Sequence, residues 1–165
     1  MTNLKNGQDI DITLRDTDGE GWRSRDHLGK MVIIHACRGE FCHTTRGEFA
    51  LWSTFMHIIN GMNTELVYLV RGGREEHKQF REQFKIRPRI LIDDDGSVGE
   101  LLDVYEPDCQ LPNDGYKYYL ASSVYLIDSK GQMSCYWISS GPRGRPSPET
   151  LLGVLALAKD NDWTY

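Results

Sequence analysis

The chain has 165 residues, of which 26% are charged and 39% hydrophobic, and its formal net charge is −5. This length suits one compact domain, so we expect a single domain over residues 1–165. The acidic balance argues against nucleic acid as a partner, because phosphate binding requires a basic face. The sequence contains no apolar run long enough to cross a bilayer and no signal-peptide pattern. We therefore expect no membrane association and a cytoplasmic location.

The first third of the chain predicts a hairpin, a buried strand and a long helix. Residues 10–15 alternate between apolar and polar side chains, as in a half-buried strand, and residues 22–24 can return after a turn at 16–21. Residues 31–34 form a continuous apolar run, which is typical of a central strand covered on both faces. A helix is expected from about Cys42 to Ile59, because its apolar residues recur at steps of three and four.

The rest of the chain continues the alternation of strands and helices. Strands are predicted at 65–70 and 89–92, helices at 75–84 and 98–104, and irregular loops at 106–116 and 139–145. Strands at 124–128 and 132–138 are joined by a hairpin turn, and a last helix runs from Ser147, its N-cap, to about Lys159. This order predicts an α/β thioredoxin-like fold, a central mixed sheet flanked by helices, with an N-terminal β-hairpin extension.

Four cysteines are present, and their spacing decides how they are interpreted. Cys37, Cys42, Cys109 and Cys135 fit no zinc-binding pattern, so we expect no metal site. Cys42 is predicted to begin a helix directly after a buried strand. Unpaired backbone N–H groups and the helix dipole favour a thiolate at that place, which lowers the pKa of a cysteine. Cys42 is therefore the predicted catalytic residue.

Three neighbours are predicted to stabilise the Cys42 thiolate. Arg38 lies four residues upstream and can add a full positive charge, and the adjacent His43 can add a partial one. Thr45 follows one helical turn later and can donate its hydroxyl to the sulfur. Each has a plainer interpretation: Arg38 as a solvated loop residue, His43 as a surface helix residue, and Thr45 as a residue that caps its own backbone.

The remaining cysteines are interpreted by their surroundings. Cys37 is a second thiol near Cys42, but it follows a buried strand and is interpreted as structural. Cys135 alternates with the apolar Met133 and Trp137, which predicts a core position. Cys109 falls in an irregular loop and is the most exposed candidate for a resolving thiol. Cys109 and Cys37 are thus the two candidates for a partner of oxidised Cys42.

The segment from Arg38 to Phe49, RGEFCHTTRGEF, carries a family resemblance. It resembles the Arg-Gly-Asp-Trp-Cys-Pro-x-Cys-Arg-x-Glu-Leu block of peroxiredoxin-like redoxins of the alkyl hydroperoxide reductase C / thiol-specific antioxidant family. Residues 29–30, 123–131 and 145–152 resemble further parts of the same family, and the likeness extends from about Asp9 to Lys159. The resemblance implies a thioredoxin-like fold and thiol chemistry at Cys42.

The sequence also departs from the family pattern. The second cysteine of the motif falls on Thr45 and its proline on His43, so a vicinal disulfide is impossible. The peroxidase branch of the family has a threonine where this chain has Gly39. It also has an arginine just before the late strand, where this chain has residues 121–123, Ala-Ser-Ser.

These observations predict a thiol-dependent oxidoreductase or antioxidant with one reactive cysteine. The Cys42 thiolate attacks a peroxide oxygen to give a sulfenic acid, or a disulfide sulfur to give a mixed disulfide. An external thiol, thioredoxin- or glutathione-like, then completes turnover. No cofactor is expected, and a homodimer is compatible with the resemblance. The alternative is a catalytically weak redox-sensing or binding module on the same fold.

Overall fold

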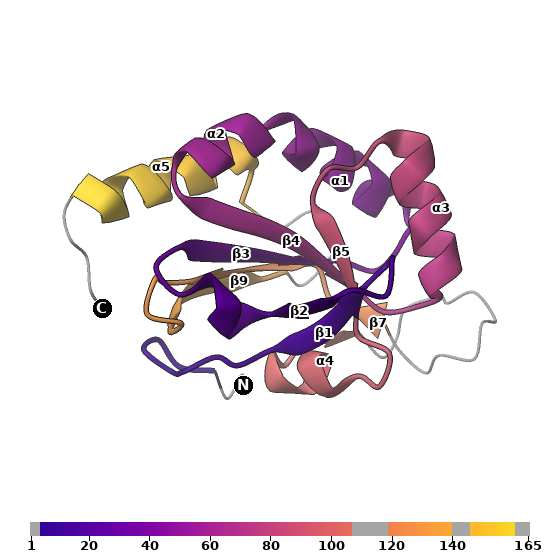
Figure 1. Cartoon of the computed structure of the whole chain (residues 1–165), viewed down its shortest axis with the longest axis horizontal. Helices are drawn as coiled ribbons and strands as arrows, with labels where there is room; N and C mark the ends of the chain where they lie inside the picture. Colours follow the sequence, from indigo (N-terminus) through magenta and orange to yellow (C-terminus); the bar gives the residue numbers. More distant parts are fainter. Residues whose placement is uncertain (1–3, 107–118, 140–145, 161–165) are drawn as a thin grey trace.

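The computed structural model describes residues 4–106, 119–139 and 146–160 (Figure 1). Seven strands form one sheet in the order β2-β1-β5-β4-β3-β8-β9, and β6 and β7 form a separate pair. The strands are β1 (Thr13–Asp16), β2 (Gly21–Arg23), β3 (Met31–Ala36), β4 (Thr64–Val70), β5 (Arg89–Ile92), β6 (Tyr105–Glu106), β7 (Tyr119–Leu120), β8 (Ser123–Ile127) and β9 (Met133–Ile138). The helices are α1 (His43–Thr54), α2 (Met56–Gly61), α3 (Arg74–Phe84), α4 (Ser97–Leu101), α5 (Pro148–Asp160) and the 3₁₀ turn η1 (Ser24–His27).

The centre of the sheet is parallel and its margins are antiparallel. β4 pairs in parallel with β3 on one side and with β5 on the other. β8 runs antiparallel to β3, β9 to β8, and β1 to β5. The carboxyl ends of β3, β4 and β5 therefore lie at one edge of the sheet, and the loop from β3 to α1 leaves from that edge.

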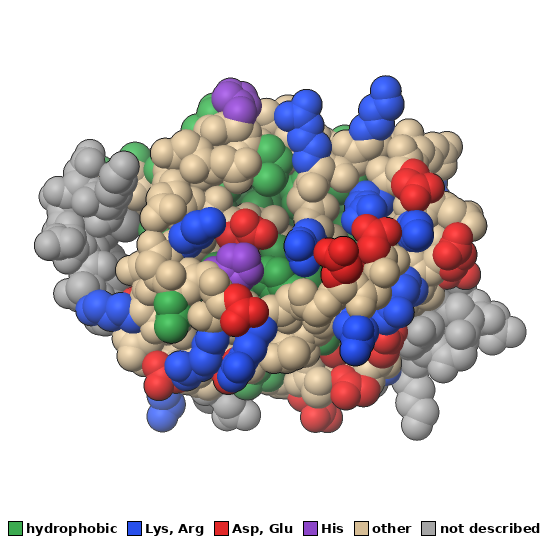
Figure 2. Space-filling view, in the orientation of Figure 1, with side chains coloured by type: hydrophobic (Ala, Val, Ile, Leu, Met, Phe, Trp, Pro, Cys, Tyr) green, Lys and Arg blue, Asp and Glu red, His purple; other side chains and the backbone are tan. Residues whose placement is uncertain are grey.

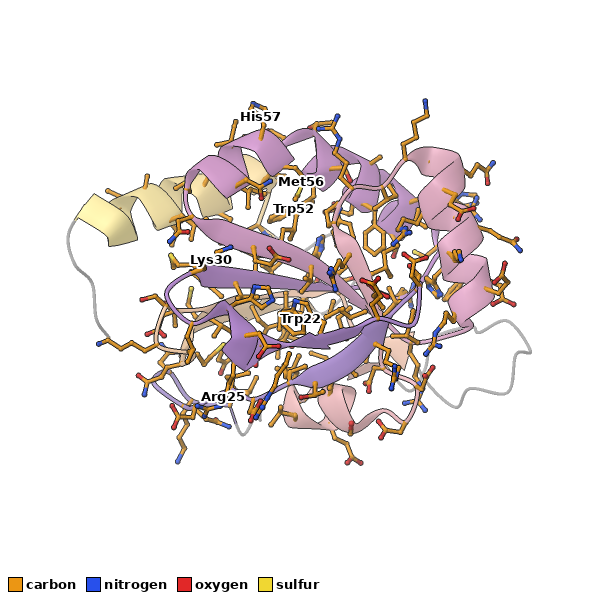
Figure 3. The ribbon with its side chains drawn as sticks, viewed as in Figure 1. Trp22, Arg25, Lys30, Trp52, Met56 and His57 are labelled. Carbon is orange, nitrogen blue, oxygen red and sulfur yellow. The ribbon has the colours of Figure 1, made fainter. Side chains whose placement is uncertain are left out.

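Two hydrophobic cores cover the two faces of the sheet. Helices α1, α2, α3 and α5 lie on one face and α4 on the other (Figure 1). Trp52 belongs to the core under the four helices, and Trp22 belongs to the core on the opposite face (Figure 3). Neighbouring residues of β3 alternate between the cores, since Ile33 lies in the first and Ile34 in the second. This explains why a continuous apolar run is needed there.

The N-terminal segment crosses the second face before the sheet begins. The Gly7 N–H donates to the Met133 carbonyl, and the Ile10 N–H donates to the Gly131 carbonyl. Ile10 and Ile12 are buried in the same core as Trp22. The segment thus connects the β8–β9 hairpin at one side of the sheet to β1 at the other.

The structure confirms the predicted fold and corrects three boundaries. The helix expected at 98–104 ends at Leu101, because Asp103 adopts a left-handed backbone with φ +54°. The strand expected from Ile10 begins at Thr13, because Ile12 N–H donates to the Ser24 hydroxyl instead of to a neighbouring strand. The helix expected to continue to Ile59 is broken at Phe55, whose N–H donates to the carbonyl three residues earlier. The predicted loops at 106–116 and 139–145 lie almost entirely outside the described residues.

The surface is mixed in charge on the face that Figure 2 shows, where acidic and basic side chains are interspersed. Within the described ranges, no helix is both long and apolar enough to cross a membrane.

Candidate active site

Cys42 lies where the chain passes from β3 into α1. We call residues Arg38–Phe41 the crossover segment. Cys42 is the N-cap residue of α1, with extended backbone angles φ −86° and ψ 117°. Its N–H donates to the Gly39 carbonyl at 3.2 Å, and its carbonyl accepts the Arg46 N–H at 3.0 Å. The predicted position of Cys42 at the start of a helix is therefore confirmed.

The surroundings of the sulfur favour its ionised form. Partial burial by itself raises the pKa of Cys42. The backbone N–H and the hydroxyl of Thr45, the N–H of Thr44 and the charge of Arg38 act in the opposite direction and prevail, so the pKa of Cys42 is lower than usual. These are the unpaired N–H groups of a first helical turn, which are available to a negative charge.

Thr45 lowers the pKa of Cys42 through two groups, its backbone N–H and its hydroxyl. The residue is completely buried. Its hydroxyl has no other hydrogen-bond partner in the described structure and is one of the groups that lower the pKa of Cys42. His43, by contrast, is exposed at the first position of α1. Its contribution to the thiolate stays a prediction.

The crossover segment has a specific backbone that Gly39 permits. Gly39 has φ +133°, and a Cβ atom added to it would lie 3.0 Å from the Phe41 ring. Next to it, the Glu40 carboxylate accepts the Phe41 N–H at 2.6 Å, and the Glu40 carbonyl accepts the Arg46 guanidinium. A side chain at position 39 is therefore disfavoured by both conformation and space.

Two buried histidines near this segment were not predicted from the sequence. His35 on β3 is completely buried, 5.0 Å from Trp52 between ring centroids, with its Nε2 4.0 Å from a Glu48 carboxylate oxygen. His77 on α3 is 2% exposed, and its Nε2 lies 3.9 Å from a Glu40 carboxylate oxygen. A signal for His77 existed, because it precedes Phe80 by three residues on the apolar face of its helix.

The other cysteines differ in exposure. Cys37 is completely buried in the core beneath α1, in keeping with a structural interpretation. Cys135 is only partly buried on β9, so the predicted core position is too deep, and burial raises the pKa of its thiol. Cys109 lies outside the described residues. The pKa of the Cys42 thiol is thus lowered where that of Cys135 is raised.

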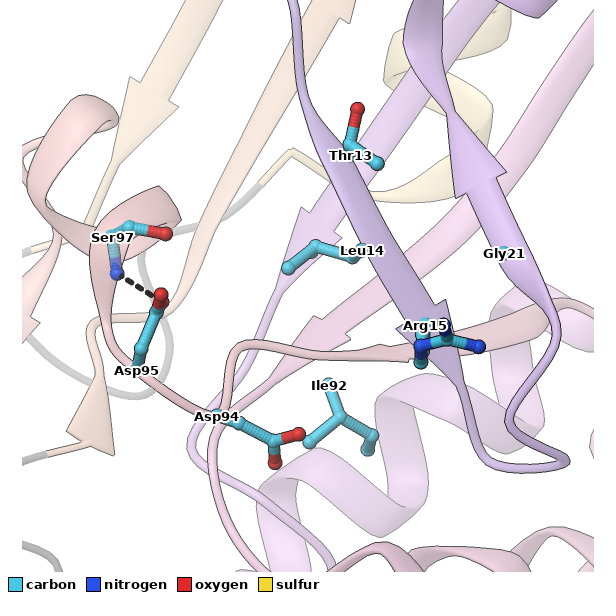
Figure 4. A pocket seen from close by; sticks show the side chains of 8 residues that line it. All are labelled: Thr13, Leu14, Arg15, Gly21, Ile92, Asp94, Asp95 and Ser97. Carbon is cyan, nitrogen blue, oxygen red and sulfur yellow. Dashed lines mark hydrogen bonds between the residues drawn. The ribbon is translucent and has the colours of Figure 1, made fainter.

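A hollow of about 330 Å³ lies between β1, β2, β5 and α4 (Figure 4). In this hollow, Asp95 accepts the Ser97 N–H at 2.9 Å. The lining contains none of the residues predicted for the site; it comprises Thr13, Leu14, Arg15, Gly21, Ile92, Asp94, Asp95 and Ser97.

The architecture and the helix-start cysteine are those of the thioredoxin-like class, and comparison with known proteins narrows the class. Residues 7–134 match the model of the AhpC/TSA family. The chain belongs to this family. A curated relative, peroxiredoxin Bcp of Bacillus subtilis, is 24% identical over 136 residues, which cover 77% of this chain and 80% of the relative.

Solved structures show the same fold. The peroxidoxin BcpB of Mycobacterium tuberculosis superposes with a TM-score of 0.78 at 15% identity, covering 96% of this chain and 99% of that one. The AhpC of Enterococcus faecalis superposes with a TM-score of 0.80 at 17% identity, covering 99% of each chain. The predicted thioredoxin-like fold is confirmed. Family membership also confirms the predicted class of thiol-dependent oxidoreductase over the binding-module alternative.

Proposed function

We propose that this protein reduces peroxides with Cys42 as its one reactive thiol. The observation that carries the proposal is the position of Cys42 as the N-cap of α1, with hydrogen-bond donors of Thr44 and Thr45 and the charge of Arg38 lowering its pKa. Because the thiolate is the nucleophile, a lowered pKa increases the reactive fraction at neutral pH. The relatives named above, a peroxiredoxin and a peroxidoxin, support peroxide as the substrate class.

The reaction follows from that arrangement. The Cys42 thiolate attacks one oxygen of the peroxide, an S–O bond forms, and the O–O bond breaks. The second oxygen leaves as alkoxide or hydroxide and takes up from the solvent the proton that Cys42 released on ionising, so the products are a Cys42 sulfenic acid and an alcohol or water. The Thr45 hydroxyl and the N–H groups stabilise the negative charge before attack. Thr45 supplies no second sulfur, so it cannot resolve the sulfenic acid.

An external thiol completes the cycle in this proposal. A first thiol condenses with the sulfenic acid, releasing water and leaving a mixed disulfide. A second thiol then attacks that disulfide, freeing Cys42 and carrying away the oxidised reductant. The complete burial of Cys37 supports an external partner over an internal one. A thioredoxin- or glutathione-like reductant, a cytoplasmic location and a homodimer belong to the same proposal.

The test is to treat the protein with one equivalent of hydrogen peroxide in the presence of dimedone and to digest it without reductant. We expect a dimedone adduct on Cys42, and no dimedone-labelled peptide from the Cys42→Ser variant. Cys135→Ser is the matched control, since Cys135 is partly buried with a raised pKa, and it should behave as the wild type.

Two results would contradict the proposal. A dominant crosslinked peptide joining Cys42 to Cys109 or to Cys37 would show that an internal thiol, and not an external one, resolves oxidised Cys42. A second-order rate constant that is higher for a model disulfide than for hydrogen peroxide would make disulfide exchange the main reaction.

A further inference from the structure

His77 reaches the crossover segment from a separate helix. Its Nδ1 lies 2.7 Å from the Gly73 carbonyl, which can only accept, so Nδ1 carries the proton of that hydrogen bond. The other ring nitrogen, Nε2, has no hydrogen-bond partner in the described structure and lies 3.9 Å from Oε2 of Glu40. A buried ring nitrogen without a partner is uncommon in native proteins and requires an explanation.

The position of Nε2 relates it to the backbone beside Cys42. It lies 3.4 Å from the point where a Cβ atom of Gly39 would be. Oε2 of Glu40, the atom that faces His77, is also the atom that accepts the Phe41 N–H. One carboxylate oxygen therefore lies between α3 and the backbone of the crossover segment.

The crossover segment in turn sets the environment of Cys42. Gly39 supplies the carbonyl that accepts the Cys42 N–H, and Arg38 supplies the positive charge that lowers the pKa of Cys42. A shift of Glu40 would move both, because the three residues are consecutive. The position of Glu40 thereby influences the fraction of Cys42 that is ionised.

We propose that His77 is a positioning residue for Cys42, which acts by orienting the Glu40 carboxylate and with it the crossover segment. The Gly73 carbonyl orients the ring through Nδ1–H, so that the Nε2–H of the imidazolium is directed at Oε2 of Glu40 and forms the ion pair. This proposal rests on the proposed role of Cys42. His77 is almost completely buried, so its role does not require contact with the substrate.

Two substitutions separate the two sides of the imidazole ring. Glutamine places an amide near the position of Nε2, which faces Glu40. Asparagine places an amide near Nδ1, which faces Gly73, and leaves nothing opposite Glu40. The measurement is the rate of Cys42 alkylation by iodoacetamide as a function of pH, with His57→Asn on the exposed side of α2 as the control.

We expect His77→Gln to resemble the wild type. In His77→Asn, the midpoint of the alkylation profile should rise by about half a pH unit, and the rate at pH 7 should fall about threefold. If His77→Asn resembled the wild type and His77→Gln shifted the midpoint, the role of His77 would be limited to its hydrogen bond with Gly73 at the start of α3. That result would overturn the proposal. Wild-type behaviour of both variants would also overturn it.

A second variant keeps the proposal testable if position 77 tolerates no change. Glu40→Gln should raise the midpoint by itself, and His77→Asn should add nothing further in that background, since both act through one contact. Additive effects, or a Glu40→Gln profile equal to that of the wild type, would overturn the proposal. Failure of the proposed peroxide reduction would appear separately, as a wild-type Cys42 that is alkylated normally but does not react with peroxide.

Discussion

Replacing Thr45 with valine isolates the contribution of one hydroxyl to the reactivity of Cys42. The side chain is completely buried and the two residues have nearly the same shape, so the substitution removes the oxygen without leaving a cavity. A hydrogen bond to a charged group contributes about 1.5–3 kcal/mol when it is fully buried. Cys42 is only partly buried, and water can replace much of the lost interaction. We therefore expect a loss of about 0.7 kcal/mol, which equals about half a pKa unit.

The effect on stability depends on pH, and its sign follows from the lowered pKa. A group whose pKa is lower in the folded state stabilises the fold fully above its unfolded pKa, about 8.5 for cysteine, and this stabilisation is lost as the pH falls through the folded pKa. Thr45→Val should therefore cost about 0.7 kcal/mol at pH 9.5. At pH 5, where Cys42 is a thiol in both states, the change should be neutral or slightly stabilising, because the buried hydroxyl then has no thiolate to donate to.

The assay is urea unfolding at the two pH values together with thiolate absorbance across the pH range. Thr45→Ser serves as the control, because it keeps the hydroxyl and loses only a methyl group. A Thr45→Val protein that is destabilised equally at both pH values, or a Cys42 pKa that does not rise, would refute the assignment of this hydroxyl to the thiolate.

Three further substitutions test other parts of the structure. Thr45→Cys should create a disulfide with Cys42 on mild oxidation, seen as the loss of two free thiols; an oxidised variant that retains all of its thiols would show that the two side chains do not share a face. Arg38→Gln should raise the pKa of Cys42 in alkylation assays, and the difference from the wild type should shrink at 1 M salt because screening weakens the charge. Asp93→Asn should lower the unfolding free energy by about 1–3 kcal/mol in urea, since the buried carboxylate accepts two N–H groups at the start of α4; the exposed Asp94→Asn should change it by much less.

Local patterns in the sequence were sufficient to predict the position of Cys42. An apolar run long enough for a buried strand precedes it, and an apolar periodicity typical of a helix follows it, so the cysteine had to lie at their junction. Thr45 could be predicted for the same reason, because its relation to Cys42 is one turn of a single helix. Residue spacing describes such contacts well when both partners belong to one element.

Contacts between elements were not predictable in the same way. His77 meets Glu40 only because α3 packs beside the crossover segment, and nothing in either local sequence specifies that packing. The helix breaks at Phe55 because side-chain hydroxyls compete with backbone N–H groups for the backbone carbonyls. The hydroxyls of Ser53 and Thr54 donate to backbone carbonyls at 2.7 Å each, and such bonds weaken a helix that the apolar pattern alone would continue.

The course of the N-terminal segment has a consequence for folding on the ribosome. Asp9 forms a bridge with Gln132, and the side chains of these two residues, 123 positions apart, are hydrogen-bonded. Until the β8–β9 hairpin has been synthesised, Ile10 and Ile12 have no complete core to enter and remain exposed on the nascent chain. Contacts of such long range form slowly, because a large loop must close first. Ile10 and Ile12 leave the ribosome well before the hairpin, so they are expected to fold late and need protection from aggregation in the meantime.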